Sequence, residues 1–479
     1  MIKQSQSFIG DKMKQSGSQL QKKSEKRMVY DRKETEYILE QKIGQGGQGS
    51  VYTTHIPNVL IKIHTEKDAQ KKKQWSQHIR WLMRQDFENL KLARPLEIIV
   101  NPTVNGYVME IMSGFNPLEQ LIEISLTGLR EEESLEGYKK TGGLRRRLML
   151  LKELAKTLAE LHGRGMAYGD LSPSNIFVSE SSEDSQVWLI DCDNICLKER
   201  ESYIHTPRYA APEIVRNESG VNISTDCWSF AVIALELLTH CHPFESGIAV
   251  EDVDPEIGLS QASQGELPWI HDKNDQSNEW TGSGLPIDIV TTQIRDLFDD
   301  CFNAGRFDIS QRPSMGTWVE KLNSALCVML NCIQNDQCMD FINAEGICPF
   351  CDEKQSSENY LVFYHYEFYP QEEKKWNKSG YVYLINVNQR ISFHSGIMGT
   401  SFYDETPVIC KIHLKEDALD IIPEAGFRIE LQEGKTVSQI NSKKSITRNI
   451  SHEKIRYALH LCPKNNDDIS HSVWVFNFS

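Results

Sequence analysis

Three polar side chains within residues 168–191 constrain this chain more than any other feature. Asp170 and Asn175 lie five residues apart in the run Tyr-Gly-Asp-Leu-Ser-Pro-Ser-Asn, and Asp191 ends the apolar run Trp-Leu-Ile. A carboxylate and an amide on one loop, with a second carboxylate after the next strand, can place a general base and hold magnesium. Each acid alone would more commonly be a cap or turn residue, so the combined spacing carries the prediction.

A glycine-rich loop precedes this region. It fits the pattern G-x-G-x-x-G and is followed by Val51; its glycines are Gly44, Gly46, Gly47 and Gly49. Residues without a Cβ let backbone N–H groups approach a polyphosphate, although glycines also mark ordinary hairpin turns. Lys62 is the lone cation of the apolar strand expected over residues 59–63. Beside a glycine loop it is a candidate phosphate ligand; elsewhere it would extend its amine to solvent at a sheet edge.

The residue pattern changes four times along the 479 residues, a length typical of two or three domains. We expect a flexible basic tail over residues 1–35, because the first 27 residues hold seven Lys or Arg against two acids and no apolar periodicity. Residues 36–114 are strand-rich, and residues 115–324 are helix-rich. Residues 325–354 concentrate cysteines, and residues 355–479 contain short β-branched and aromatic runs.

These runs predict an all-β domain. Short strands without helical periodicity, separated by Gly, Asn, Asp, Pro and Lys, are typical of a sandwich or barrel. The expected strands cover residues 360–369, 381–387, 390–394, 408–414, 427–431, 454–462 and 473–478.

Charge and hydropathy exclude some classes of function. The formal net charge of −15 has the wrong sign for dedicated nucleic-acid binding. The longest apolar stretch, residues 230–238, is too short for a membrane span and contains Glu236. The first residues hold no hydrophobic signal segment, so we expect a cytoplasmic protein with reduced thiols.

The cysteine spacing predicts a structural zinc site. The ligands would be Cys332, Cys338, Cys348 and Cys351, of which the last two form a C-x2-C turn. The upstream spacing of five residues is wide, so Cys327 or His365 could replace one ligand. Free thiols and disulfides remain alternatives. A closed four-cysteine site would leave no position for catalysis.

In the order and spacing of its motifs, the sequence resembles the eukaryotic-like protein kinase superfamily over residues 36–324. The resemblance implies an α+β two-lobed fold, with residues 36–114 as the N-lobe and 115–324 as the C-lobe. It implies that the glycine loop covers ATP, Lys62 binds its phosphates, Asp170 is the catalytic base, and Asn175 and Asp191 hold Mg²⁺. The run Thr-Pro-Arg-Tyr-Ala-Ala-Pro-Glu would end the activation segment; the implied structural residues are Glu213, its partner Arg312, and Asp226 at the start of a central helix.

The sequence also departs from the family pattern. Tyr168-Gly169 replaces the usual His-Arg, Cys192-Asp193 replaces Phe-Gly, and Ser172 stands where Ser/Thr kinases carry Lys. Without the Arg, the hydroxyls of Ser202 and Tyr203 are not expected to control activity through phosphorylation. No acid occurs between Asp68 and Asp86 to pair with Lys62, and Glu88 could do so only after a longer loop.

The resemblance implies an ATP- and Mg²⁺-dependent protein kinase acting on Ser/Thr hydroxyls rather than a small-molecule phosphotransferase. The loop and the Ala-Ala-Pro-Glu ending look most like a bacterial branch of these kinases, which implies a metal-dependent phosphatase and a von Willebrand factor A-like protein as partners. The alternative is a pseudokinase scaffold that recognises proteins through its β domain. The altered Asp-Cys-Asp motif favours that alternative, and the retained Lys62, Asp170, Asn175 and Asp191 oppose it.

Overall fold

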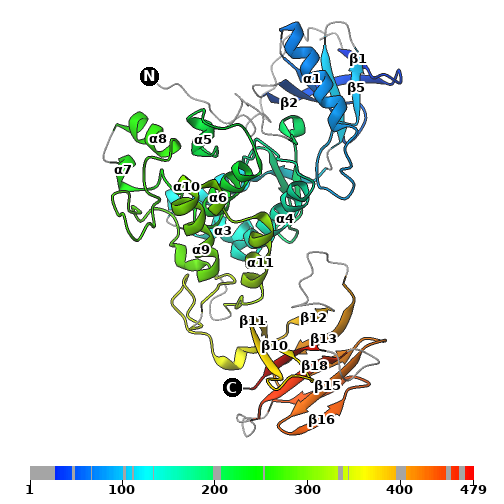
Figure 1. Cartoon of the computed structure of the whole chain (residues 1–479), viewed down its shortest axis with the longest axis vertical. Helices are drawn as coiled ribbons and strands as arrows, with labels where there is room; N and C mark the ends of the chain where they lie inside the picture. Colours follow the sequence, from blue (N-terminus) through cyan, green and yellow to red (C-terminus); the bar gives the residue numbers. More distant parts are fainter. Residues whose placement is uncertain are drawn as a thin grey trace, which may run out of the picture. The chain divides into compact units, whose positions relative to one another are not determined.

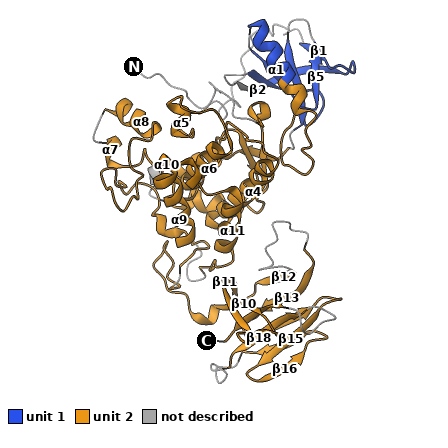
Figure 2. Ribbon diagram, in the orientation of Figure 1, with its two compact units in different colours: residues 1–77, 95–111 blue, residues 78–94, 112–479 orange. Residues whose placement is uncertain are grey.

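The computed structural model describes residues 27–45, 49–65, 67–100, 104–110, 113–132, 134–197, 206–251, 254–332, 338–343, 345–394, 406–448, 455–462 and 470–478. The chain divides into two compact units, coloured separately in Figure 2. The first takes Met1–Gln77 and Pro95–Ile111, and the second takes His78–Arg94 and Met112–Ser479.

The first unit contains a six-stranded antiparallel sheet (Figure 1). Its strand order is β1-β2-β3-β4-β6-β5, with β1 Met28–Tyr30, β2 Glu36–Gln45, β3 Gly49–Thr54, β4 Val59–His64, β5 Glu97–Val100 and β6 Asn105–Glu110. The buried core of the sheet comprises Val29, Tyr37, Leu39, Ile61, Ile63, Ile99, Val104 and Val108. Helix α1, Ala69–Leu82, begins after Asp68, whose carboxylate accepts hydrogen bonds from the Gln70 and Lys71 amides.

The start of this sheet corrects one prediction. The predicted basic tail includes residues 28–35, but Met28–Tyr30 pairs with β2. Val29 is fully buried in the sheet core, and Asp31 accepts hydrogen bonds from the Lys33 and Thr35 amides in the turn before β2. A single apolar residue on a three-residue strand gives too short a pattern to detect from sequence. Residues 1–26, the rest of the predicted tail, lie outside the described residues.

The helical part of the second unit is organised around α6, Ile223–Thr239. Every residue from Thr225 to Thr239 is buried, as expected for a central helix. The other α-helices are α2 Leu118–Glu132, α3 Glu136–Lys140, α4 Gly143–Gly163, α5 Pro212–Val215, α7 Ile248–Glu251, α8 Pro255–Ser263, α9 Thr292–Asp299, α10 Gly305–Phe307 and α11 Met315–Leu326. A small antiparallel sheet is formed by β7 Phe115–Pro117, β8 Ile176–Ser179 and β9 Val187–Leu189.

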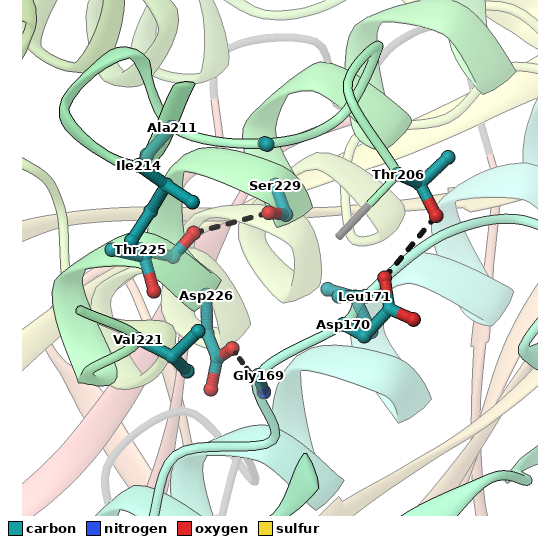
Figure 3. Close-up of a pocket in the computed structure, with 11 residues that line it drawn as sticks. Gly169, Asp170, Leu171, Thr206, Ala211, Ile214, Val221, Thr225, Asp226 and Ser229 are labelled. Carbon is teal, nitrogen blue, oxygen red and sulfur yellow. Dashed lines mark hydrogen bonds between the residues drawn. The ribbon is translucent and has the colours of Figure 1, made fainter. Parts of the chain in front are cut away.

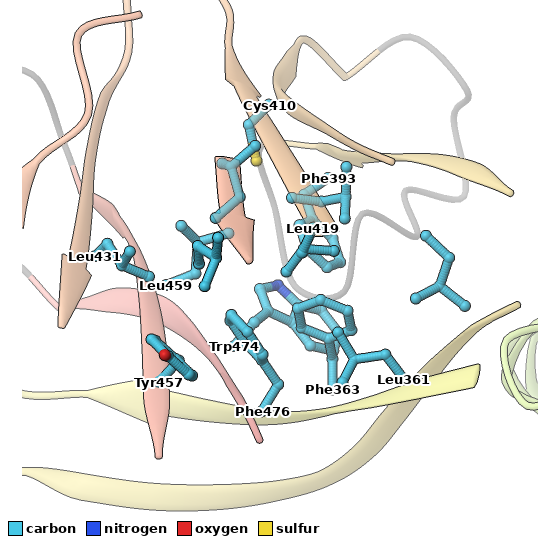
Figure 4. Packing of buried hydrophobic residues seen from close by; sticks show 14 of the residues in the cluster. Leu361, Phe363, Phe393, Cys410, Leu419, Leu431, Tyr457, Leu459, Trp474 and Phe476 are labelled. Carbon is cyan, nitrogen blue, oxygen red and sulfur yellow. The ribbon is translucent and has the colours of Figure 1, made fainter. Parts of the chain in front are cut away.

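The C-terminal part of the second unit is β-rich, as predicted. A six-stranded sheet has the order β11-β10-β19-β18-β15-β16, with β10 Tyr360–Phe368, β11 Trp376–Asn386, β15 Arg428–Glu433, β16 Thr436–Gln439, β18 Tyr457–Cys462 and β19 His471–Phe476. A four-stranded sheet has the order β12-β13-β14-β17, with β12 Arg390–His394, β13 Val408–Leu414, β14 Ala418–Pro423 and β17 Lys444–Thr447. Both sheets contribute to one apolar core, in which Phe393 and Trp474 stack at 4.7 Å (Figure 4).

Three of these strands were not predicted: β14, β16 and β17. Strand β14 follows β13 after a turn of three charged residues, 415–417, and its short apolar run is interrupted by Asp420 and ends at Pro423, which weakens the strand signal. Strands β16 and β17 are short and mostly exposed, so their side chains are largely polar. Among the described residues, no helix combines the length and apolar character needed to cross a bilayer.

Candidate active site and four-cysteine cluster

The loop between α4 and β8 brings Asp170 and Asn175 together. The Asn175 side-chain amide donates a 2.9 Å hydrogen bond to the Asp170 carbonyl, and the Asn175 backbone amide donates to the Ser172 carbonyl at 3.0 Å. The loop is therefore closed by its own polar groups. Ser172 is 1% exposed, and its hydroxyl lies 3.0 Å from that of Ser174.

Asp226 anchors this loop to the central helix. Its Oδ2 accepts a 2.6 Å hydrogen bond from the Tyr168 amide, and its Oδ1 accepts a 2.9 Å bond from the Gly169 amide (Figure 3). The Nε2 of His162 lies 3.0 Å from the same Oδ2. A buried carboxylate that accepts several hydrogen bonds holds its donors in a fixed geometry. The residues just before Asp170 are thereby fixed to α6.

Gly169 stands where the family usually carries Arg, and its backbone explains the replacement. Its φ is +94°, a conformation that favours glycine. A Cβ here would lie 2.9 Å from Val221 Cγ1 and 3.0 Å from the Asn194 carbonyl oxygen. A side chain larger than that of glycine therefore cannot fit here unless the surrounding residues shift.

Tyr168, at the place of the family's His, is fully buried. Burial raises the pKa of its phenol well above the ordinary value, and the nearby Cys192 and carboxylates act in the same direction. The neutral phenol donates a hydrogen bond to the Ile190 carbonyl. Tyr168 thereby connects the loop of Asp170 to the residue before Asp191.

Asp191 lies two residues after the end of β9 at Leu189. The Ile190 amide donates a 3.0 Å hydrogen bond to the Asn175 carbonyl, so the segments that carry the two candidate magnesium ligands are joined through their backbones. Asp191 has a positive φ of 58°, and a 3₁₀ turn over Cys192–Asn194 follows. Cys192 is fully buried where the family carries Phe, and its thiol donates to the Ala93 carbonyl at 3.6 Å.

Thr206 connects the far end of the activation segment to the loop. Its hydroxyl donates a 3.1 Å hydrogen bond to Asp170 Oδ1 (Figure 3). Residues 198–205, including Ser202 and Tyr203, lie outside the described residues. The prediction about their phosphorylation therefore stays a prediction.

Glu236 fixes the residues after Thr206 to the central helix. It accepts a 2.7 Å hydrogen bond from the Tyr209 hydroxyl and a 2.9 Å bond from Arg208. The Ser229 hydroxyl donates to the Tyr209 carbonyl at 2.8 Å. Sequence reasoning missed this role, although a single acid within the apolar stretch of residues 230–238 was a signal for it.

The end of the activation segment contains a buried ion pair. The two terminal nitrogens of Arg312 donate to the two carboxylate oxygens of Glu213 at 2.7 and 2.8 Å. The side chain of Arg312 is fully buried, and its guanidinium lies 4.9 Å from the ring centroid of Trp228. A third bond runs from Arg312 Nε to the Gly305 carbonyl at 2.8 Å. The pair joins α5 to the turn before α11.

Lys62 lies in the first unit, on the central strand β4. It pairs with Val51 of β3 on one side and Tyr107 of β6 on the other, and it is 3% exposed. Gly44 and Gly49 lie at the facing ends of β2 and β3, whereas Gly46 and Gly47 lie outside the described residues. A Cβ at Gly49 would lie 2.4 Å from the Ile63 carbonyl oxygen, so a side chain there would collide with β4.

Helix α1 carries no acidic residue. Trp75 lies in the middle of this helix and stacks on His64, with 4.4 Å between the ring centroids. The ring of Tyr107 stacks on the same Trp75 with a centroid distance of 6.0 Å. Glu88, the distant alternative partner of Lys62, is exposed and lies beyond the end of α1 at Leu82.

The four cysteines form one cluster. The sulfur atoms of Cys332, Cys338, Cys348 and Cys351 all lie within 4.8 Å of one another. Cys332 and Cys351 are 3.5 Å apart and Cys338 and Cys348 are 3.2 Å apart, well beyond a disulfide bond of about 2.05 Å. Burial raises the pKa of Cys348 to about 11. Neither Cys327 nor His365, the predicted alternatives, belongs to this cluster.

Sequence comparison relates this chain to known proteins. Residues 37–347, more than half of the chain, match the protein kinase domain. Serine/threonine-protein kinase dkf-2 of Caenorhabditis briggsae is 32% identical over 124 residues, which is 25% of this chain and 10% of that protein. Serine/threonine-protein kinase pkn2 of Myxococcus xanthus is 32% identical over 133 residues, which is 26% of this chain and 15% of that protein.

A third relative, calcium-dependent protein kinase 5 of Plasmodium berghei (strain Anka), is 28% identical over 158 residues, which is 32% of this chain and 24% of that protein. The chain thus spans no more than about a quarter of the length of any of these three relatives. The family match covers the ordered motifs, the loop of Asp170 and the helix that anchors it. This chain belongs to the protein kinase family.

Proposed function

We propose that this protein is an ATP- and Mg²⁺-dependent Ser/Thr protein kinase. The observation that carries the proposal is the loop of Asp170, closed by Asn175 and anchored through backbone amides to buried Asp226. Catalysis of phosphoryl transfer depends mainly on positioning of the reacting groups and on charge neutralisation. The hydrogen bonds of this loop hold Asp170 in a fixed position. Asp170 would accept the proton of the substrate hydroxyl, and Lys62 would bind the ATP phosphates.

Magnesium ligands fit the same region. Asn175 offers an amide oxygen and Asp191 a carboxylate, which are the hard oxygen donors that Mg²⁺ prefers. The ion, when bound, would neutralise the negative charge of the phosphates. The glycines Gly44, Gly46, Gly47 and Gly49, with Val51, would cover the nucleotide.

The hydrogen bond from Thr206 supports an aliphatic hydroxyl as the acceptor. Asp170 Oδ1 already accepts from the hydroxyl of a Thr side chain at 3.1 Å. A substrate Ser or Thr would offer the same donor group to the same carboxylate. The names of the relatives point in the same direction.

The alternative of a pseudokinase scaffold rests on Cys192-Asp193 and on the absence of an acid in α1. The structure supplies a packing reason for Cys192, which is buried and hydrogen-bonded to Ala93. A scaffold would also have no need of an Asp170 whose carboxylate is held by Thr206 and whose backbone carbonyl is held by Asn175. The enzyme is therefore the better proposal.

We also propose one structural Zn²⁺ at the four-cysteine cluster. Tetrahedral Zn–S bonds of about 2.3 Å require sulfurs about 3.8 Å apart, and the four sulfurs lie within 4.8 Å of one another. The amide nitrogen of the Gln355 side chain lies 3.6 Å from Cys332 Sγ, as an outer hydrogen bond to a thiolate would. The ion would be structural because all four positions are protein sulfurs.

The remaining proposals concern cellular context. Protein substrates follow from the kinase family, and residues 355–479 would form a sandwich-like domain that recruits partners. The bacterial-type resemblance still predicts a cytoplasmic protein that acts with a metal-dependent phosphatase and a von Willebrand factor A-like protein. Co-purification of these partners with the tagged chain would test this prediction.

The activity is tested by incubating the purified chain with Mg²⁺ and ATP labelled at the γ-phosphate, alone and with a generic acceptor protein. We expect label on Ser or Thr in wild type and a rate of labelling about 10²- to 10⁴-fold lower in Asp170→Asn. The matched control is Asp296→Asn, which alters an exposed carboxylate on α9 and should keep full activity. Label on Tyr alone, or none in wild type, would contradict the proposal.

A further inference from the structure

The four-stranded sheet of the C-terminal part carries a hollow on its outer face. The hollow has a volume of about 560 Å³ and is lined by residues of β12, β13 and β14 and by Lys415 and Lys443, which lie outside these strands. That volume falls within the range of pockets that hold small ligands, roughly 300–1,000 Å³. None of its lining residues takes part in the candidate active site or the cysteine cluster.

The strand register places polar side chains together on this face. Adjacent residues on one row across the sheet are Arg390, His413 and Asp420, and on the next row Ser392, Lys411 and Ile422. Side chains alternate between the faces of a sheet, and the residues between these rows belong to the buried apolar core. At the hollow the outer face therefore carries mostly polar and charged side chains, with Ile422 as an exposed apolar member.

Positive charge is in excess at this face. Its cations are Arg390, Lys411, Lys415 and Lys443. Asp420 accepts hydrogen bonds from both Lys415 and Lys443 at 2.9 Å, and Lys411 lies 2.6 Å from Glu424. Arg390 forms no ion pair with any described residue. Two carboxylates thus face four cations, on a chain whose net charge is −15.

The pKa of His413 reflects the positive electrostatic potential at this face. Slight burial and the neighbouring Arg390, Lys415 and Lys443 lower its pKa, and Asp420 opposes them without cancelling the effect. The groups around the imidazole therefore disfavour a further positive charge. A bound anion would relieve this repulsion.

We propose that this basic face binds a phosphorylated segment of a protein through phosphoserine or phosphothreonine. Arg390 and Lys411 would donate charge-assisted hydrogen bonds to the phosphoryl oxygens. Ile422, which pairs with Lys411 across the sheet, is 37% exposed. An apolar side chain next to the phosphorylated residue of the ligand could pack against it. Among the described residues that line the hollow there is no Phe, Tyr or Trp side chain, and His413 is the one ring on which a base could stack. The acidic chain also repels polynucleotides, so a phosphopeptide fits better than a nucleic acid.

The test uses the full chain without ATP or Mg²⁺, so that no transfer occurs. Its binding to an immobilised peptide library with a central phosphothreonine is compared with binding to the same library carrying threonine. We expect a preference for the phosphorylated library, reduced about tenfold or more in the double variant Arg390→Glu and Lys411→Glu. Lys435→Glu, an exposed charge reversal in the β15–β16 turn, should keep the preference.

Melting temperatures show whether each variant is folded. If the charge-reversed protein melts early, Arg390→Met with Lys411→Met removes the same charges without adding repulsion. Equal retention of both libraries by wild type would overturn the proposal, as would an undiminished preference in the folded double variant. Competition by single-stranded DNA that exceeds competition by the phosphopeptide would also overturn it. Because ATP is absent, these outcomes are independent of whether the chain transfers phosphate.

Discussion

The Thr206 hydroxyl donates a 3.1 Å hydrogen bond to the carboxylate of Asp170. This bond joins the end of the activation segment to the loop that carries the proposed base. The Asp170 carbonyl is held separately by Asn175, so backbone and side chain are restrained by different partners. Thr206 is therefore one of the groups that orient the carboxylate.

Removing this hydroxyl should lower turnover. In Thr206→Ala the carboxylate loses one hydrogen bond to a charged group, worth about 1.5–3 kcal/mol, and we expect kcat to fall about tenfold or more. Thr206→Ser keeps the hydroxyl and should retain most activity. Steady-state kinetics check this, with melting temperatures to exclude unfolding. Equal activity in the Ala variant would show that the bond does not position Asp170.

Gly169→Ala should destabilise the fold. The new Cβ would meet Val221 and Asn194 in a backbone conformation with positive φ, which costs about 1–3 kcal/mol. Urea unfolding measures this change. The matched control is Gly163→Ala at the end of α4, where a Cβ has no neighbour within 4 Å; its stability should stay the same or rise slightly. Equal effects at both positions would contradict the packing argument.

Breaking the buried ion pair should be more damaging than breaking an exposed one. Glu213→Ala leaves the fully buried Arg312 side chain without its carboxylate and should cost about 3–5 kcal/mol. Glu136→Ala, which breaks an exposed pair with Lys140 in α3, should cost less than about 1 kcal/mol. Denaturant unfolding of both variants gives the comparison, and a small loss in Glu213→Ala would argue against a structural role.

Much of the fold could be predicted from the sequence, because its signals were local. The kinase family prediction rests on motifs such as Asp170 to Asn175, and the family match confirms it. The β-rich nature of residues 355–479 was visible in β-branched runs and is confirmed by the two sheets. The four cysteines were visible from their C-x2-C half, and the structure shows them as one cluster.

Other features depend on contacts between distant residues, which spacing alone does not reveal. Asp226 was expected only as the start of a helix, yet it accepts bonds from amides nearly 60 residues earlier in the chain. The restriction at Gly169 arises from Val221 and Asn194, which tertiary packing brings close. The basic face likewise follows from the register of β12, β13 and β14, and β14 was not predicted.

Purified protein should contain about one zinc per chain. Cys348→Ser should remove it and lower the melting temperature, because residues near the cluster bond to β11 through Leu384 and Asn386. The matched control is Cys327→Ser, a buried thiol outside the cluster, which should keep the zinc. Elemental analysis of wild type and both variants measures the zinc content per chain. A protein purified without chelators that holds no zinc would contradict the site.

The central claim is that Asp170 acts as the base in phosphoryl transfer without contacting the nucleotide. The most direct measurement compares Asp170→Asn with wild type in two assays, ATP affinity by calorimetry with Mg²⁺ and label transfer from ATP to an acceptor protein. We predict nearly unchanged affinity and a fall in transfer rate of about 10²- to 10⁴-fold, the usual contribution of a general base. Transfer at the wild-type rate in Asp170→Asn would contradict the account.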